Sequence, residues 1–127
     1  SSLAKFILKE EGWEEVKNFL LKGTVSLDFA LKEVSNAIWK HSVIYKRIPK
    51  DLAFLAFNQM KKLSEVIKIE SESKYLDEAL KIAMDKRITI YDSLYIVQAK
   101  SYDGMLTSDK KQAEVAEGVG LNVYYVE

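Results

Sequence analysis

The chain has 127 residues, the size of one domain, and 48% of them are hydrophobic while 30% are charged. This balance supports a well-packed globular core and excludes a disordered or low-complexity chain. The 19 Lys and Arg residues equal the 19 Asp and Glu residues, so a broadly basic nucleic-acid or membrane-surface binder is not expected, although a local basic patch is compatible with the sequence. The absence of cysteine and the single histidine exclude disulfides, thiolate chemistry and sites with two His ligands. An enzyme of this sequence must use carboxylates, hydroxyls, lysines or a hard metal ion.

Two further expectations concern the setting and the start of the chain. The longest apolar runs are too short to cross a bilayer and no secretory signal is visible, so we expect a soluble cytoplasmic protein without a membrane partner. No repeats or linkers interrupt the sequence, which predicts a single domain over residues 1–127. Because the chain opens at Ser1 without a methionine and its first predicted element is a helix, we expect a further N-terminal strand upstream of Ser1.

Hydrophobic periodicity predicts helices that alternate with short strands. In chain order the pattern predicts helices at 3–9 and 13–22, a strand at 24–27, helices at 28–46 and 49–63, a strand at 66–69, a helix capped by Ser73, a helix at 91–101, a turn at 103–104, a strand at 105–107, a helix at 110–117 and a strand at 122–126. Strands separated by helices favour an α/β sandwich with a mostly parallel sheet.

Individual residues within this pattern carry expectations of their own. Asp28 and Ser73 stand where N-caps are expected, because their side chains can accept hydrogen bonds from the first amides of a helix. His41 shares the apolar period of its helix, which favours a packed or interface residue over a catalytic base. Trp13 and Trp39 are large apolar side chains, for which core burial is the first expectation and an interface the second.

Three carboxylates stand near strand ends and helix beginnings, where α/β folds place functional groups. Glu33 lies in the first turns of a predicted helix, and Asp92 and Asp109 begin two later ones. A helix N-terminus stabilises a carboxylate by roughly 0.3–1 kcal/mol and lowers its pKa. Converging carboxylates would repel one another unless a divalent cation lay between them, and oxygen ligands suit Mg²⁺ or Mn²⁺. Simple helix capping is the competing interpretation.

Four short segments carry a recurring pattern of acidic, hydroxyl and apolar residues. They are SSLAKF at 1–6, EVSNAIW at 33–39, YDSLYIVQAK at 91–100 and MLTSD at 105–109. Together they resemble PIN-domain ribonucleases, in particular the VapC-type toxins. The second segment is similar to that family's E-x-x-N-A-hydrophobic motif, the third to its D-x-x-Y…A helix, and the fourth to its L-hydrophobic-T-x-D strand end. The first segment resembles the stretch after the first aspartate of a D-x-S pattern, so the resemblance covers nearly the whole chain.

The resemblance implies a PIN-like three-layer α/β/α sandwich with a mostly parallel sheet. It implies that Glu33, Asp92 and Asp109 are catalytic, metal-binding carboxylates. Supporting polar groups are implied at Ser1, Asn36, Thr107 and Ser108. The first aspartate of the family would lie just upstream of Ser1, outside this sequence, together with the first strand.

The activity that the resemblance implies is that of a metal-dependent endoribonuclease, the toxin of a toxin–antitoxin pair. One or two Mg²⁺ (or Mn²⁺) ions would bind the acidic cluster, activate a water and support its in-line attack on an RNA phosphodiester. The implied partners are RNA, an antitoxin protein and a second copy of the chain in a homodimer formed through the early helices. Lysines would offset the repulsion between the acidic pocket and RNA, and the candidates are Lys5, Lys9, Lys40, Lys110 and Lys111.

Two other functions fit the same residues. A non-catalytic, degenerate PIN-like interaction module would have lost its metal site and would show no Mn²⁺-dependent change in thermal stability. A metal phosphatase or phosphodiesterase acting on small molecules would use the same carboxylates, and nucleotide monophosphates would compete with it better than short RNA.

Overall fold

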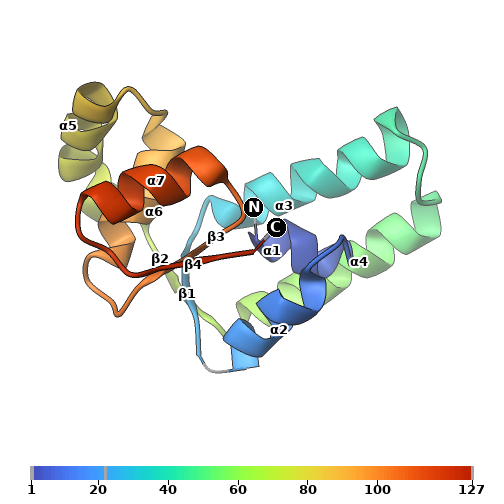
Figure 1. Cartoon of the computed structure of the whole chain (residues 1–127). Helices are drawn as coiled ribbons and strands as arrows, with labels where there is room; N and C mark the ends of the chain where they lie inside the picture. The colour runs from blue at the N-terminus through green and yellow to red at the C-terminus, as the bar shows by residue number, and fades with distance from the viewer. Residues whose placement is uncertain (1, 22, 127) are drawn as a thin grey trace. The chain divides into compact units, whose positions relative to one another are not determined.

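The computed structural model of the protein describes residues 2–21 and 23–126 (Figure 1). These residues form two compact units, which divide between Glu70 and Ser71. Each unit combines helices with a pair of parallel strands, which agrees with the expected α/β class. A single sheet within a three-layer sandwich stays a prediction from the resemblance. None of the helices in the described ranges has both the length and the apolar character needed to cross a membrane.

The first unit packs helices around a small apolar core. Its elements are α1 (Ser2–Ile7), α2 (Trp13–Leu21), β1 (Val25–Leu27), α3 (Ala30–Trp39), the π-helical segment η1 (Lys40–Ile44), α4 (Lys50–Ser64) and β2 (Lys68–Glu70). The long helices α3 and α4 lie side by side in Figure 1, and α1 packs against both. The core forms where apolar side chains at helical spacing meet, and its buried members are Ala4, Ile7, Val34, Ile38, Ala56 and Met60. β1 and β2 pair in parallel, with Ser26 opposite Ile69.

The second unit is built around one central helix. Its elements are the 3₁₀ turn η2 (Glu72–Tyr75), α5 (Leu76–Lys86), α6 (Ile90–Ala99), β3 (Met105–Thr107), α7 (Lys110–Gly118) and β4 (Val123–Tyr125). Most of α6 is buried, and the helix packs against α5, α7 and β3. This burial agrees with a sequence that is apolar around most of the helix circumference. β3 and β4 pair in parallel, with Leu106 opposite Tyr124. The central position of α6 fixes where its first turn, and therefore Asp92, lies in the unit.

The helix expected over residues 28–46 begins later and changes character within the chain. The Asp28 amide donates a hydrogen bond of 2.9 Å to the Glu70 carbonyl oxygen, so Asp28 still belongs to the strand pairing and Phe29 is the N-cap. Regular α-helical bonding ends at Trp39, where the wider turns of η1 take over. Both predicted boundaries were wrong, because a 3.6-residue apolar period reveals neither a backbone bond to a distant strand nor a π-helical turn.

Ser73 was wrongly predicted as a helix cap. It lies within η2, where its Oγ is 2.8 Å from the Ser71 Oγ. The residue that precedes α5 is the buried Tyr75, and the helix starts at Leu76. The 3₁₀ turn therefore delays the helix beyond the residue that the local sequence favours.

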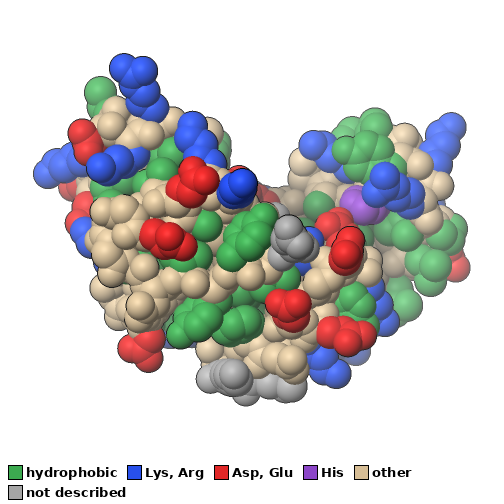
Figure 2. All heavy atoms as spheres, viewed as in Figure 1, with side chains coloured by type: hydrophobic (Ala, Val, Ile, Leu, Met, Phe, Trp, Pro, Cys, Tyr) green, Lys and Arg blue, Asp and Glu red, His purple; other side chains and the backbone are tan. Residues whose placement is uncertain are grey.

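Trp39 is exposed over 49% of its surface, so the expectation of core burial was wrong. It belongs to a group of exposed apolar side chains around η1 and the start of α4: Trp39, Val43, Ile44, Tyr45, Leu52, Phe54 and Leu55. Figure 2 shows hydrophobic side chains beside Lys and Arg side chains at this end of the helical pair. An interface role for Trp39 stays a prediction.

The structure agrees more closely with the expectations for Trp13 and His41. Trp13 is half-buried and packs on Phe6, with 6.4 Å between the ring centres. His41 is half-buried, its Nε2 lies 3.1 Å from Glu10 Oε1, and its ring meets Tyr45 edge-on at 5.5 Å. His41 is thus a packed residue, as its position in the apolar period predicts.

Replacing Gly104 by alanine should destabilise the second unit. A Cβ atom at Gly104 would lie 2.8 Å from the Asn122 carbonyl oxygen and 3.1 Å from Tyr124 Cε2, so β3 and β4 would have to separate. We expect the free energy of unfolding to fall by about 1–3 kcal/mol in chemical denaturation. Gly118→Ala is the control, because a Cβ there meets nothing within 4 Å and alanine favours the helix, and it should be neutral or stabilising. Equal losses in both variants would contradict this account.

Candidate functional site

Asp92 lies in the first turn of α6, next to the residue that caps this helix. The Thr89 Oγ1 accepts a hydrogen bond of 3.2 Å from the Asp92 amide, and the Thr89 hydroxyl also bonds to the Asp92 carboxylate. Thr89 and Asp92 have the spacing of a capping box, and their contacts hold the carboxylate at the helix start. Asp92 could be identified from the sequence, whereas Thr89 was missed, although a threonine three residues before an acid is the signal for such a pair.

Asp109 begins α7 as its N-cap. Its Oδ1 accepts a hydrogen bond of 2.9 Å from the Gln112 amide. Its own amide donates a bond of 3.0 Å to the Oγ1 of Thr107, which is buried at the end of β3. The capping interpretation is therefore correct for Asp109. It does not exclude a second role, because the cap uses one of the two carboxylate oxygens.

The buried Gln112 connects the end of β3 with the first turn of α6. The Gln112 Oε1 accepts a hydrogen bond of 2.6 Å from the Thr107 hydroxyl, and its Nε2 donates one of 3.2 Å to the Asp92 carbonyl oxygen. Gln112 was missed from the sequence, because its contacts lie in other elements and belong to no motif. The available signal was a polar residue beside Ala113 on the inner face of a short helix, where an amide must find partners.

The Asp109 carboxylate is close enough to Asp92 to act on its pKa. Burial, and after it the Asp109 carboxylate, raise the pKa of Asp92 above its ordinary value. The hydrogen bond from Thr89 and the charge of Lys111 act in the opposite direction and only partly offset the rise. The helix N-terminus alone predicted a lowered pKa, and this expectation was wrong for Asp92. The causes of the rise are lost water and a second carboxylate, and neither is visible within one helix.

The other expected site residues are divided between the two units. Glu33 and Asn36 are exposed on α3 in the first unit, whereas Ser108 is half-buried beside Asp109. Ser1 lies outside the described residues. Within either unit, the described residues contain no group of three or more His, Asp or Glu side chains able to hold a metal ion. The second unit thus brings together Asp92 and Asp109, and the convergence of Glu33 with them stays a prediction.

Lys111 is the lysine that lies beside the acidic pair. Its charge acts on Asp92, and its Nζ donates a hydrogen bond of 3.3 Å to the Arg87 carbonyl oxygen. Lys110 is exposed in the first turn of α7. The other three candidates, Lys5, Lys9 and Lys40, belong to the first unit.

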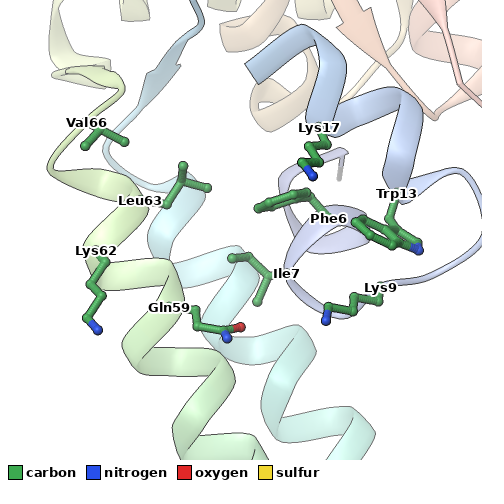
Figure 3. Close-up of a pocket in the computed structure, with 9 residues that line it drawn as sticks. All are labelled: Phe6, Ile7, Lys9, Trp13, Lys17, Gln59, Lys62, Leu63 and Val66. Atoms are coloured by element: carbon green, nitrogen blue, oxygen red, sulfur yellow. The ribbon is translucent and has the colours of Figure 1, made fainter. Parts of the chain in front are cut away.

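The first unit contains an apolar groove edged by lysines (Figure 3). Its volume is about 560 Å³, and its lining consists of Phe6, Ile7, Lys9, Trp13, Lys17, Gln59, Lys62, Leu63 and Val66. The Lys9 Nζ lies 5.7 Å from the centre of the Trp13 ring, within the range of a cation–π contact. The lining combines three lysines with no carboxylate.

Comparison with known proteins finds similarity to a ribonuclease along most of the chain. That relative is Ribonuclease VapC3 of Pyrobaculum aerophilum, which is 28% identical over 119 residues that span 90% of this chain and 88% of the relative. No family model matches the chain. The similarity supports the resemblance to VapC-type PIN ribonucleases, which the motifs at 33–39, 91–100 and 105–109 suggested.

Replacing Asp92 by asparagine should stabilise the protein in a pH-dependent way. Because the pKa of Asp92 is raised in the folded state, that state holds its proton more tightly than the unfolded chain, and stability falls as pH rises from the ordinary aspartate pKa to the raised one. The free energy of unfolding of Asp92→Asn should therefore exceed that of the native protein by more at about pH 7 than at about pH 3. Chemical denaturation at both pH values measures this difference.

Asp103→Asn is the control for this experiment, since Asp103 is an exposed turn residue in the same unit. Its effect on the free energy of unfolding should be nearly the same at both pH values. A pH dependence of Asp92→Asn no larger than that of Asp103→Asn would show that burial and the Asp109 charge do not act on Asp92 as inferred.

Proposed function

We propose that the chain is a divalent-metal-dependent endoribonuclease of the VapC type. The observation that carries the proposal is the pair of interacting carboxylates, Asp92 and Asp109, at the starts of two adjoining helices. The similarity to a ribonuclease along 90% of the chain supports it independently. Both supports bear on the same residues, because the pair lies in the segments that carry the family motifs.

The donor atoms of this pair suit Mg²⁺ or Mn²⁺. Both ions prefer oxygen ligands, and Mg²⁺ in particular is often held by one or two carboxylates together with substrate phosphates. Two carboxylates whose interaction raises a pKa would also lose their mutual repulsion beside a cation. When bound, such a metal ion supplies charge neutralisation at the phosphodiester that is attacked.

The other functions of the site would be performed by side chains of this chain. Asp92 and Asp109 hold negative charge at one place, and the Thr107 and Gln112 side chains hold the two helix starts together. Lys111 places a positive charge next to the acids, where the RNA backbone would pass. Glu33 is proposed as a third carboxylate contributed by α3, on the strength of the family motif.

The toxin role and the partners are the finer part of the proposal. A VapC-type ribonuclease implies an antitoxin that covers its active site, and a homodimer formed through the early helices. The groove in the first unit, with three lysines and an apolar floor, would suit a partner segment that mixes acidic and apolar side chains. The exposed apolar group around Trp39 offers a surface that a second copy could cover.

RNA cleavage should depend on the proposed carboxylates. We expect Asp92→Asn, Asp109→Asn and Glu33→Gln each to lower the rate of Mn²⁺-supported cleavage of a labelled RNA by more than about 100-fold, since even outer-shell partners of metal ligands cost about 10- to 100-fold. Chelation of divalent ions with EDTA should abolish cleavage in the native protein. Asp103→Asn and Glu114→Gln, which alter exposed acids in the second unit, should cleave at the native rate.

Three outcomes separate the competing functions. Full cleavage by Asp92→Asn would remove the assignment of the site. No cleavage by the native protein, together with no Mn²⁺-dependent rise in its melting temperature, would favour the non-catalytic interaction module. Inhibition by nucleotide monophosphates but not by short RNA would favour a phosphatase or phosphodiesterase of small molecules.

Expression of the protein in a bacterial host should arrest growth if it acts as a toxin. The arrest should disappear with Asp92→Asn and persist with Asp103→Asn at equal protein levels, because only the first change touches the acidic pair. Growth curves after induction measure the effect. Undisturbed growth with a native protein that cleaves RNA in vitro would separate the nuclease activity from the toxin role.

A further inference from the structure

We infer that Gln112 is a positioning residue that sets the arrangement of the Asp92 and Asp109 carboxylates. This role rests on the proposed function for its effect on catalysis, but the contacts that support it are independent of any activity. Gln112 contacts all three elements that meet at the acidic pair, and it is almost completely buried, at 7% exposure. Its side-chain hydrogen bonds go to neither carboxylate, so it would act through other groups.

Both ends of the Gln112 amide are used. The Oε1 accepts from the Thr107 hydroxyl at the end of β3, and the Nε2 donates to the Asp92 carbonyl oxygen in the first turn of α6. The orientation of the amide is set by these partners, because a carbonyl oxygen can only accept and must therefore face the NH₂ group. The side chain thus bridges a strand end and a helix start that are well separated along the chain, at 107 and 92.

The backbone of the same residue holds the second aspartate. The Gln112 amide donates to Asp109 Oδ1, and the Asp109 amide donates to Thr107 Oγ1, which closes a ring of hydrogen bonds through Thr107, Asp109 and Gln112. A movement of the Gln112 backbone therefore moves the Asp109 carboxylate. A loss of its side-chain amide removes the hydrogen bond that joins α7 to the Asp92 carbonyl oxygen in the first turn of α6.

The chemistry of the position favours glutamine over its closest alternatives. Asparagine is one methylene shorter, and methionine has a similar shape but neither hydrogen-bonding end. Glutamate could accept from Thr107, but when ionised it would face the Asp92 carbonyl oxygen with a charge and would add a third carboxylate to the pair. A neutral amide joins the elements without adding to the repulsion.

The test compares Gln112→Met with Gln98→Met. Gln98 is a similarly buried glutamine, at 4% exposure, further along α6, so the two variants remove the same kind of side chain from the same unit. Two quantities are measured. One is the titration midpoint of the Asp92 carboxyl, followed by ¹³C NMR without metal. The other is the pair of kcat and KM values for Mn²⁺-supported RNA cleavage.

Gln112→Met is expected to shift the Asp92 midpoint towards that of an ordinary aspartate and to lower kcat by about 10- to 100-fold with little change in KM. Gln98→Met should do neither, even where it costs as much stability. If Gln112→Met shifts neither quantity, or if both variants shift them equally, the positioning role is wrong. If the native protein cleaves no RNA but the midpoint moves in Gln112→Met alone, Gln112 positions the pair and the proposed function fails.

If Gln112→Met does not fold, Gln112→Glu is the variant that tests the positioning role. Its kcat relative to that of the native protein should rise as pH is lowered, because the protonated carboxyl regains a donor for the Asp92 carbonyl oxygen. A ratio of the two kcat values that does not change with pH would overturn the inference.

Discussion

Two like charges held near each other at the starts of two helices are the constraint on which the second unit depends. Ionised carboxylates move apart unless other bonds hold them, and here the bonds come from helix caps and one buried amide. Thr89 holds the Asp92 side, and the ring through Thr107 holds the Asp109 side. Because the pKa of Asp92 is raised, its ionisation lowers the folding stability at neutral pH, and perturbed pKa values of this kind are common at functional sites.

The positions of these acids could be predicted from the sequence because helix starts are local events. Asp92 and Asp109 stand directly before or within apolar periods that mark α6 and α7, and the family motifs have the same spacing. The groups that hold the acids could not be predicted in the same way. The partners of Gln112 lie up to 20 residues away, and the direction of the Asp92 pKa depends on a neighbour from another helix.

The first unit shows a different limit of prediction from sequence. The apolar period of α3 identifies its inner face, including Val34 and Ile38, but the same period continues into η1 and suggests a longer regular helix. Trp39 shows a limit of the apolar pattern. The pattern identifies a large apolar side chain, but it does not tell whether this chain itself buries that side chain. The groove in this unit has no counterpart in any motif, because its lining comes from separate helices.

The short interval from Thr107 to Gln112 has a consequence for how such a chain can diverge. The hydrogen-bonded ring requires fixed numbers of residues between Thr107, Asp109 and Gln112. One inserted residue in α7 would rotate the subsequent side chains by about 100° around the helix axis. The exposed Lys110 and Lys111 can change identity freely as far as the ring is concerned, but the interval cannot change length. Insertions and deletions among relatives should therefore collect elsewhere, for example in the turn before Gly104, and leave the stretch from Thr107 to Gln112 intact.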